Sequence, residues 1–148
     1  MYQRILVPVD GSGTSARGLE EAIKIGKLCG ARLKLLHVVE QLIYAPGLHA
    51  DVAPLMREEG ERVLAHARAQ VEAAGLAVET KLFETQSIRL AELVRNEARA
   101  WQAELVVIGT HGRRGMSRLL LGSDAEQVLR LSDTPVLLVR GQDEPAAA

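Results

Sequence analysis

Glycines and a serine between residues 109 and 123 are spaced in a pattern that favours phosphate binding. Gly109, Gly112, Gly122 and Ser123 form the arrangement Gly-x2-Gly-x9-Gly-Ser, after an apolar run and before a helical pattern. Glycine lets the backbone approach a ligand closely and adopt positive φ angles. A helix that begins at Gly122-Ser123 presents free N–H groups and the positive end of its dipole. The stretch is therefore predicted to cradle the phosphates of a nucleotide.

His111 and three arginines belong to the same stretch. His111 precedes Gly112 and is expected to be exposed, where it could donate a hydrogen bond to a phosphate. No other histidine stands at metal-ligand spacing from it. Arg113, Arg114 and Arg118 add local positive charge that could offset a triphosphate, although no fixed contact is assigned to any of them.

Two observations weigh against a simple phosphate site. Asp124 follows Gly122-Ser123, and a carboxylate there suits the helix dipole but would weaken the binding of nearby phosphates. The same pattern would arise if Gly109 and Gly112 only formed a turn and Ser123 only capped a helix. The local pattern leaves this alternative open.

Asp10 closes the first apolar run of the chain, from Ile5 to Val9. If that run is a strand, the carboxylate lies at its carboxyl end, where it could accept from a ligand hydroxyl or hold Mg²⁺. An aspartate directly before Gly11 is also typical of a turn. Spacing alone does not separate these two roles.

Alternating periodicities predict the elements that must position these residues. Strands are expected over five short apolar runs, at residues 5–9, 33–39, 78–82, 104–108 and 136–139. Helices are expected between them, at residues 15–30, 56–75, 90–101 and 125–133. Residues 41–54 are interpreted as a loop that could act as a lid, because they contain Pro46, Gly47 and Pro54.

Strands that alternate with helices predict an α/β fold with a mostly parallel sheet and helices on both faces. Ligands of such sheets bind beyond the carboxyl ends of the strands, where the strand order reverses. Asp10, residues 38–40 and Gly109 are expected there. The strand at 78–82 alternates apolar with polar residues and is expected at a sheet edge, whereas the strand at 104–108 is expected to be central.

Length and composition indicate one domain over residues 1–148, with 141–148 as a frayed tail. A net charge of −1 leaves no whole-chain attraction to nucleic acid or to an anionic membrane. No apolar run reaches the roughly 18 residues of a membrane span, so a cytoplasmic location is expected. The single cysteine, Cys29, excludes an intramolecular disulfide and is expected to be a buried, inert thiol.

Four segments, in order and at matching spacing, resemble the universal stress protein family, in the branch whose members bind ATP. They are Ile5-Leu6-Val7-Pro8-Val9-Asp10-Gly11-Ser12, His37-Val38-Val39, the glycine pattern, and Thr134-Pro135-Val136-Leu137-Leu138-Val139. The resemblance spans nearly the whole chain. It implies a Rossmann-like open sheet of five strands, similar to the adenine nucleotide alpha hydrolases.

The resemblance also implies a binding site for ATP with Mg²⁺ or Mn²⁺. Near the adenosine and phosphates it implies Pro8, Val9 and Asp10, and at the adenine it implies the backbone of Val38. Asp10 is the candidate contact for a metal ion that ATP carries. Along the ribose and phosphates it implies Ile108, Gly109, His111 and Gly112, with Gly122 and Ser123 holding the phosphates. It further implies a homodimer through Val136–Val139. No general base is evident, so hydrolysis is expected to be absent or slow.

Two other functions compete with this interpretation. Gly11-x-Gly13-x-x-Ala16 after a strand, with Glu40 closing the next strand, satisfies the fingerprint of an NAD-dependent oxidoreductase. However, 148 residues leave little room for a separate substrate domain. The second alternative is a dimeric interaction scaffold that acts without nucleotide, which the fold alone does not exclude.

Overall fold

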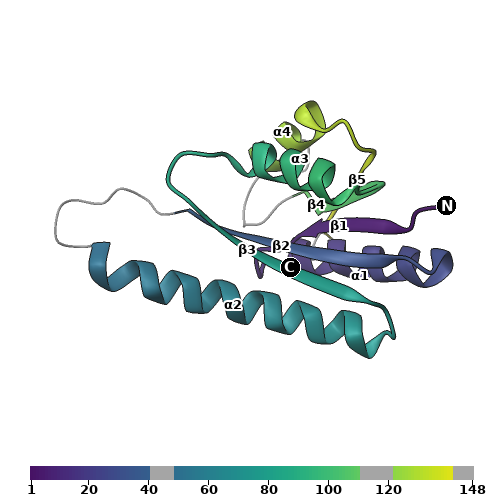
Figure 1. The fold of residues 1–148 in the computed structure, drawn as a ribbon, viewed down its shortest axis with the longest axis horizontal. Coiled ribbons are helices and arrows are strands. Elements are labelled where there is room, and N and C mark those ends of the chain that lie inside the picture. The colour runs from purple at the N-terminus through teal and green to yellow at the C-terminus, as the bar shows by residue number, and fades with distance from the viewer. Residues whose placement is uncertain (41–48, 111–121, 142–148) are drawn as a thin grey trace, which may run out of the picture.

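Five strands form one open, parallel sheet in the order β3-β2-β1-β4-β5 (Figure 1). The computed structural model describes residues 1–40, 49–110 and 122–141. The strands are β1 (Arg4–Pro8), β2 (Arg32–Glu40), β3 (Val78–Thr85), β4 (Leu105–Gly109) and β5 (Val136–Val139). All four pairings are parallel, which confirms the predicted sheet, and β3 lies at an edge as expected. β4 is an interior strand between β1 and β5.

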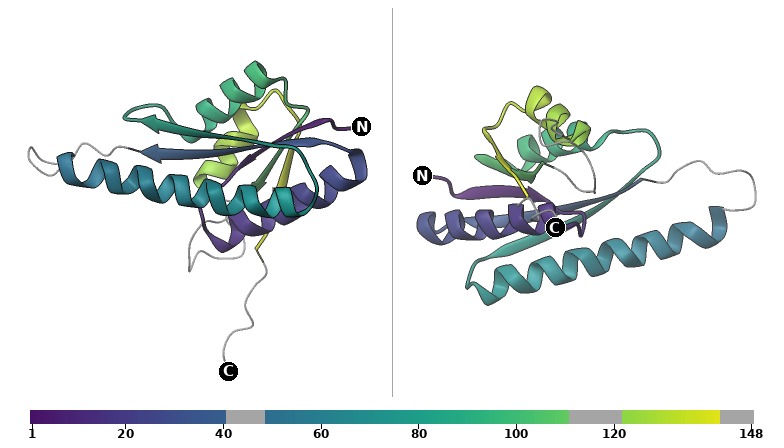
Figure 2. Two further views of the ribbon diagram at one scale, coloured as in Figure 1. Left: turned by 60° about the horizontal axis from the view of Figure 1, so that its bottom comes forward. Right: turned by 180° about the vertical axis from the view of Figure 1, so that it is seen from behind.

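Four helices cover the two faces of the sheet. They are α1 (Gly13–Cys29), α2 (His49–Ala73), α3 (Leu90–Trp101) and α4 (Ser123–Leu131). α1 and α2 lie against one face, and α3 and α4 lie against the other (Figure 2). This three-layer arrangement is the α/β architecture that the order of elements predicts.

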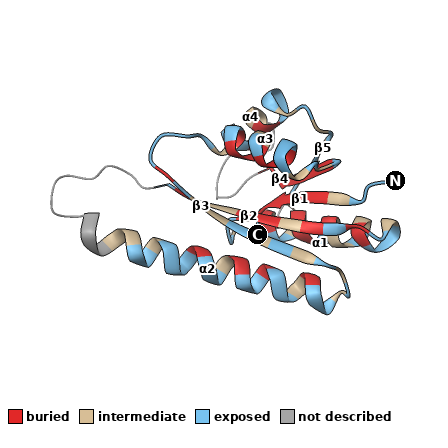
Figure 3. Cartoon of the chain, viewed as in Figure 1, coloured by how far each residue is buried: buried red, intermediate tan, exposed pale blue. Residues whose placement is uncertain are grey.

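Successive residues of the central strands enter two different apolar layers. On the side of α1 and α2, Ile5 and Val7 pack with Leu33, Leu35 and Val107. The second layer lies on the opposite side. It contains Leu6, Leu36 and Val106 of the sheet, Val94 of α3 and Val128 of α4. A strand covered on both faces needs apolar residues at every position, which explains the continuous apolar runs of β1 and β4. Figure 3 shows this buried centre between the helices.

Local signals account for the ends of α1 and α2. The hydroxyl of Ser12 accepts from the N–H of Ser15 and caps the start of α1. Gly30 ends α1 with a φ of 67°, and Gly75 follows α2 with a φ of 79°. Both values lie in the left-handed region that glycine adopts without steric cost. The helices expected at residues 15–30 and 56–75 therefore end where the sequence predicts, within two residues.

Two expectations from the sequence need correction. The predicted loop over residues 41–54 is too long, because α2 begins at His49 and includes Pro54. Near a helix start the ring of Pro54 removes only one N–H from a helix of 25 residues. Cys29 is only half-buried, since it is the last residue of α1.

Two predictions fall on residues outside those that the structure describes. The lid prediction concerns residues 41–54, of which 41–48 are not described, and the frayed-tail prediction concerns residues 141–148, of which 142–148 are not described. Gly141, the first residue of the predicted tail, lies beside Thr14, and an added Cβ there would meet Thr14 Cγ2 at 2.6 Å. The lid and the frayed tail therefore stay predictions.

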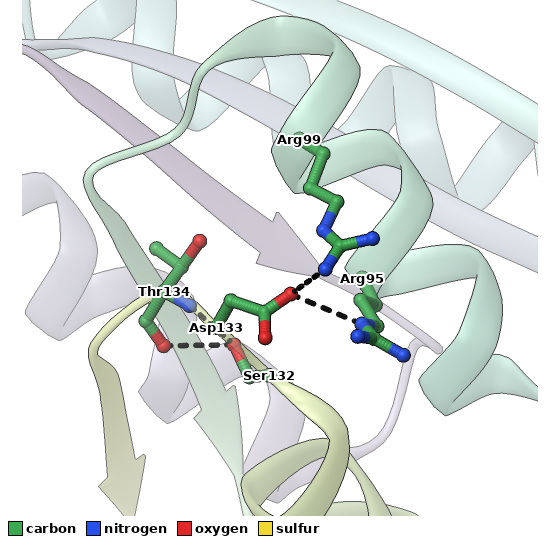
Figure 4. Close-up of polar contacts among 5 residues, drawn as sticks. All are labelled: Arg95, Arg99, Ser132, Asp133 and Thr134. Carbon is green, nitrogen blue, oxygen red and sulfur yellow. Dashed lines mark hydrogen bonds and ion pairs between the residues drawn. The ribbon is translucent and has the colours of Figure 1, made fainter.

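Asp133 joins α3 to the turn that leads into β5 (Figure 4). Its carboxylate accepts from Arg95 Nε at 3.0 Å and pairs with Arg99 at 2.5 Å. The hydrogen bond from Arg95 is the main reason that the pKa of Asp133 lies below its usual value. In the same turn, Ser132 Oγ donates to the carbonyl of Thr134 at 2.7 Å. These contacts hold the start of β5 against α3.

Among the described residues, no helix combines the length and apolar character that crossing a bilayer requires.

Candidate functional site

A cavity of about 510 Å³ lies beyond the carboxyl ends of β1, β2 and β4. β1 has β2 on one side and β4 on the other, so the strand order reverses at this point. Ligands of open α/β sheets bind at such a reversal, and the volume is within the roughly 300–1,000 Å³ of ligand pockets. The position is the one predicted from the sequence.

The lining of the cavity divides by chemistry. Apolar side chains come from β2, β4, α3 and α4, namely Leu36, Val38, Leu90, Ile108 and Ala125. Polar groups come from the starts of two helices, namely Ser12, Thr14 and Ser15 of the α1 start and Gly122, Ser123 and Asp124 of the α4 start. The other polar residues of the lining are Asp10, His37, Glu40 and Thr110. A ligand with an apolar ring system and an anionic group would match both parts.

Asp10 organises the turn between β1 and α1. Its Oδ1 accepts from the N–H of Ser12 at 2.8 Å, and its own N–H donates to Ser15 Oγ at 3.0 Å. Asp10 therefore has the turn-forming role that the sequence left open. The side chain is also exposed in the cavity wall, and its Oδ2 accepts no hydrogen bond from a described residue. A ligand or cation could contact that oxygen.

A divalent cation at Asp10 would need most of its ligands from elsewhere. The described residues contain no cluster of three or more His, Cys, Asp or Glu side chains arranged to hold a metal. Mg²⁺ is commonly bound through one or two carboxylates together with substrate phosphates and water. The residues present thus fit a cation that arrives with a nucleotide, and such an ion would offset phosphate charge.

Gly109 allows α1 to pack directly on the end of β4. A Cβ on Gly109 would lie 2.4 Å from the carbonyl oxygen of Thr14, which is closer than any side chain tolerates. This contact brings the first turn of α1 to the cavity. Thr110 then donates its N–H to Val139, and its carbonyl accepts from Gly122 N–H at 3.0 Å. The chain therefore returns at Gly122 close to the point where it left the sheet.

The start of α4 has the features of an anion site. Gly122 is the N-cap residue, and no side-chain hydrogen bond caps this helix. The first hydrogen bond of the helix runs from Glu126 N–H to the carbonyl of Gly122. The N–H groups of Ser123, Asp124 and Ala125 come before it and so have no partner within the helix. Asp124 and Glu126 in the first turn place negative charge beside them.

The structure brings together all the predicted site residues that it describes. They line the one cavity, and they are Pro8, Val9, Asp10, Val38, Ile108, Gly109, Gly122 and Ser123. His111 and Gly112 lie outside the described residues. That these residues bind a nucleotide stays a prediction.

Sequence reasoning missed several residues of the wall. Ser12 could have been predicted as part of the wall, because a serine at the start of a helical pattern is a typical N-cap and the helix begins beside the cavity. Thr14 lies in the first turn of the same helix. Leu90 has no such signal, since it reaches the cavity only through the packing of α3. Thr110 also lines the cavity, and its buried hydroxyl has no hydrogen-bond partner among the described residues.

Comparisons of the sequence with known proteins identify relatives over nearly the whole chain. The sequence model of the Universal stress protein family matches residues 1–140. Universal stress protein MJ0531 of Methanocaldococcus jannaschii is 33% identical over 145 residues, which cover 95% of this chain and 83% of that protein.

Two solved structures have the same fold. A universal stress protein family member from Burkholderia pseudomallei is 34% identical, with a TM-score of 0.78 over 93% of this chain and 96% of that one. A universal stress protein in complex with cAMP is 26% identical, with a TM-score of 0.70 over 95% of this chain and 98% of that one. The chain therefore belongs to the universal stress protein family.

Proposed function

We propose that this protein binds an adenine nucleotide in the cavity and acts in a stress response through nucleotide occupancy and dimer contacts. ATP with Mg²⁺ or Mn²⁺ is the proposed ligand, with hydrolysis absent or slow. The observation that carries the proposal is the convergence of two helix starts and an apolar wall on one cavity at the strand reversal. The relative solved with cAMP supports an adenine nucleotide as ligand. The cytoplasmic location stays a prediction.

Homodimerisation through β5 is part of the same proposal. β5 is an edge strand that pairs only with β4 among the described strands. Its Leu137 is 37% exposed, and unpaired strand edges readily pair with another chain. A two-fold axis beside β5 would join the two sheets.

Calorimetric titration with ATP·Mg²⁺, AMP, cAMP and NADH tests the function. Binding of ATP, AMP or cAMP with clearly higher affinity than NADH supports the proposal. NADH binding alone would instead support the oxidoreductase interpretation. Failure to bind any of the four would leave the nucleotide-independent scaffold as the better interpretation.

Gly122→Glu should weaken ATP binding at least about tenfold. The new carboxylate would stand at the N-cap of α4, where the phosphates are proposed to lie, and like charges about 4 Å apart repel by roughly 1–4 kcal/mol. The same titration measures the loss. Ala100→Glu on the exposed side of α3 adds the same charge away from the cavity and should leave affinity unchanged. Equal affinity in both variants would place the phosphates elsewhere.

Asp124→Asn should strengthen nucleotide binding by roughly three- to tenfold for ATP and less for AMP. The carboxylate lies in the cavity wall in the first turn of α4, so its repulsion grows with the number of phosphates. Affinities in low-salt buffer without divalent cations show the effect best, because salt screens exposed charges. Glu126→Gln is the matched control, since Glu126 pairs with Arg130 and does not line the cavity. A gain equal for ATP and AMP would contradict the prediction.

A further inference from the structure

The peptide between Val9 and Asp10 is held by the side chain of His37. The carbonyl oxygen of Val9 lies 2.7 Å from His37 Nδ1, and the N–H of Val9 donates to the carbonyl of Leu36 at 2.8 Å. A carbonyl oxygen can only accept, so Nδ1 of His37 must carry the proton. Both polar groups of Val9 are therefore bonded to β2, immediately before Asp10.

The other side of the His37 ring packs on the backbone of α2. A Cβ on Gly60 would lie 2.8 Å from His37 Cδ2 and 2.8 Å from Leu82 Cδ1. Gly60 is buried, and only the absence of a side chain there leaves room for the imidazole. The position of the ring thus depends on the position of α2.

α2 also contacts the residue that follows Asp10. A Cβ on Gly11, whose φ is 83°, would lie 3.1 Å from Val63 Cγ2. Gly60 and Val63 are three residues apart and so share one face of α2. That face of α2 therefore contacts both neighbours of Asp10. It supports Val9 through the ring of His37, and it contacts Gly11 directly.

We propose that His37 is a positioning residue, which with the Gly60–Val63 face of α2 orients Asp10 toward the bound ligand. Asp10 forms the turn and exposes a carboxylate oxygen in the cavity wall, so a shift of its backbone would move that oxygen. A displacement of α2 would consequently move His37 and Gly11, and with them the carboxylate of Asp10. The inference rests on the proposed function for its effect on affinity, whereas the contact itself can be tested in the free protein.

Two substitutions at His37 separate the hydrogen bond from the volume of the side chain. In Asn the amide nitrogen is the same number of bonds from Cα as Nδ1 is in His, so it can donate to the carbonyl of Val9. Leu has a similar shape to Asn and no donor. His66, exposed on α2, provides the control variant His66→Asn.

Spectra of the free protein test the contact without nucleotide. Long-range ¹H–¹⁵N NMR of the wild type should show His37 protonated at Nδ1, and a ring protonated only at Nε2 would overturn the proposal even if no variant folds. The backbone amides of Asp10 and Gly11 should shift in His37→Leu and return toward wild-type positions in His37→Asn. Amides that do not move in His37→Leu would also overturn it.

A double-mutant cycle tests the route through Asp10. His37→Leu should lower ATP affinity about tenfold, the order expected for one lost hydrogen bond, and His37→Asn should restore most of it. In an Asp10→Ala background the same change should cost less than about twofold, because residues that act through one another are not additive. An equal loss in both backgrounds would overturn the proposal. If the wild type binds neither ATP, AMP nor cAMP, the proposed function fails, and the amide shifts of Asp10 decide this inference alone.

Discussion

Gly109→Ala should destabilise the protein by about 2–3 kcal/mol, the upper part of the range for overpacked cores. The added Cβ would lie 2.4 Å from the carbonyl oxygen and 2.6 Å from the carbonyl carbon of Thr14. These are backbone atoms, which cannot rotate away as a side chain end can. The end of β4 and the first turn of α1 must therefore separate. Urea denaturation measures the loss in the free energy of unfolding.

Gly13→Ala is the matched control for this prediction. Gly13 is the first residue of α1, and a Cβ there would meet nothing within 4 Å. Alanine should leave the free energy of unfolding unchanged or raise it by up to about 1 kcal/mol, because it restricts the unfolded chain. If Gly109→Ala were no less stable than Gly13→Ala, the close packing of α1 on β4 would be wrong. Because Gly109 and Thr14 both line the cavity, nucleotide binding should fall with stability only in Gly109→Ala.

Glu97→Gln should destabilise the protein by about 2 kcal/mol at neutral pH. Glu97 is 5% exposed, and its two carboxylate oxygens pair with Lys34 at 2.5 Å and Lys81 at 2.9 Å. Lys34 is itself mostly buried, near the ring of Trp101. Removing the carboxylate leaves two ammonium groups close together, one of them poorly solvated, and uncompensated buried charge is costly. Urea denaturation of both proteins measures the difference.

The effect of Glu97→Gln should depend on pH. Burial would raise the pKa of Glu97, but the hydrogen bonds and charges of Lys34 and Lys81 outweigh burial, so the pKa lies below its usual value. A carboxyl whose folded pKa is lowered stabilises the fold above its unfolded pKa of about 4.3. That contribution is lost as pH falls below this value and through the folded pKa. Wild type and Glu97→Gln should therefore begin to converge in stability as pH falls below the unfolded pKa, and the difference should be lost fully only below the folded pKa.

Glu79→Gln, on the neighbouring strand β3, is the control for the pH series. Glu79 is exposed, and no hydrogen bond or ion pair joins it to another residue that the structure describes, so its replacement should change stability by less than about 0.5 kcal/mol at every pH. A Glu97→Gln difference that stays constant from pH 7 to pH 3 would show that lost packing, and not lost charge, causes the destabilisation.

Patterns within a few residues of one another predicted the elements and the end of the sheet that holds the site. The strongly apolar run at 104–108 predicted an interior strand, and the alternation at 78–82 predicted an edge strand, because each reflects how many faces of the strand are covered. Gly30 and Gly75 marked helix ends through the φ values that only glycine adopts easily. The Gly122-Ser123 pair likewise predicted the start of α4.

Contacts between distant segments were decided only by the tertiary structure. The half-buried position of Cys29, the entry of Leu90 into the cavity wall and the pairing of Glu97 with Lys34 follow no local pattern. The support of Val9 by His37 and Gly60 joins three different elements. Periodicity and turn chemistry act over a few residues, so the sequence by itself determined which segments become strands and helices, and it marked the ends of α1 and α2 at Gly30 and Gly75, but not the start of α2 or the end of β3. Which side chains then meet depends on the strand order and on the close packing of helices on the sheet, because both arise from the whole chain at once.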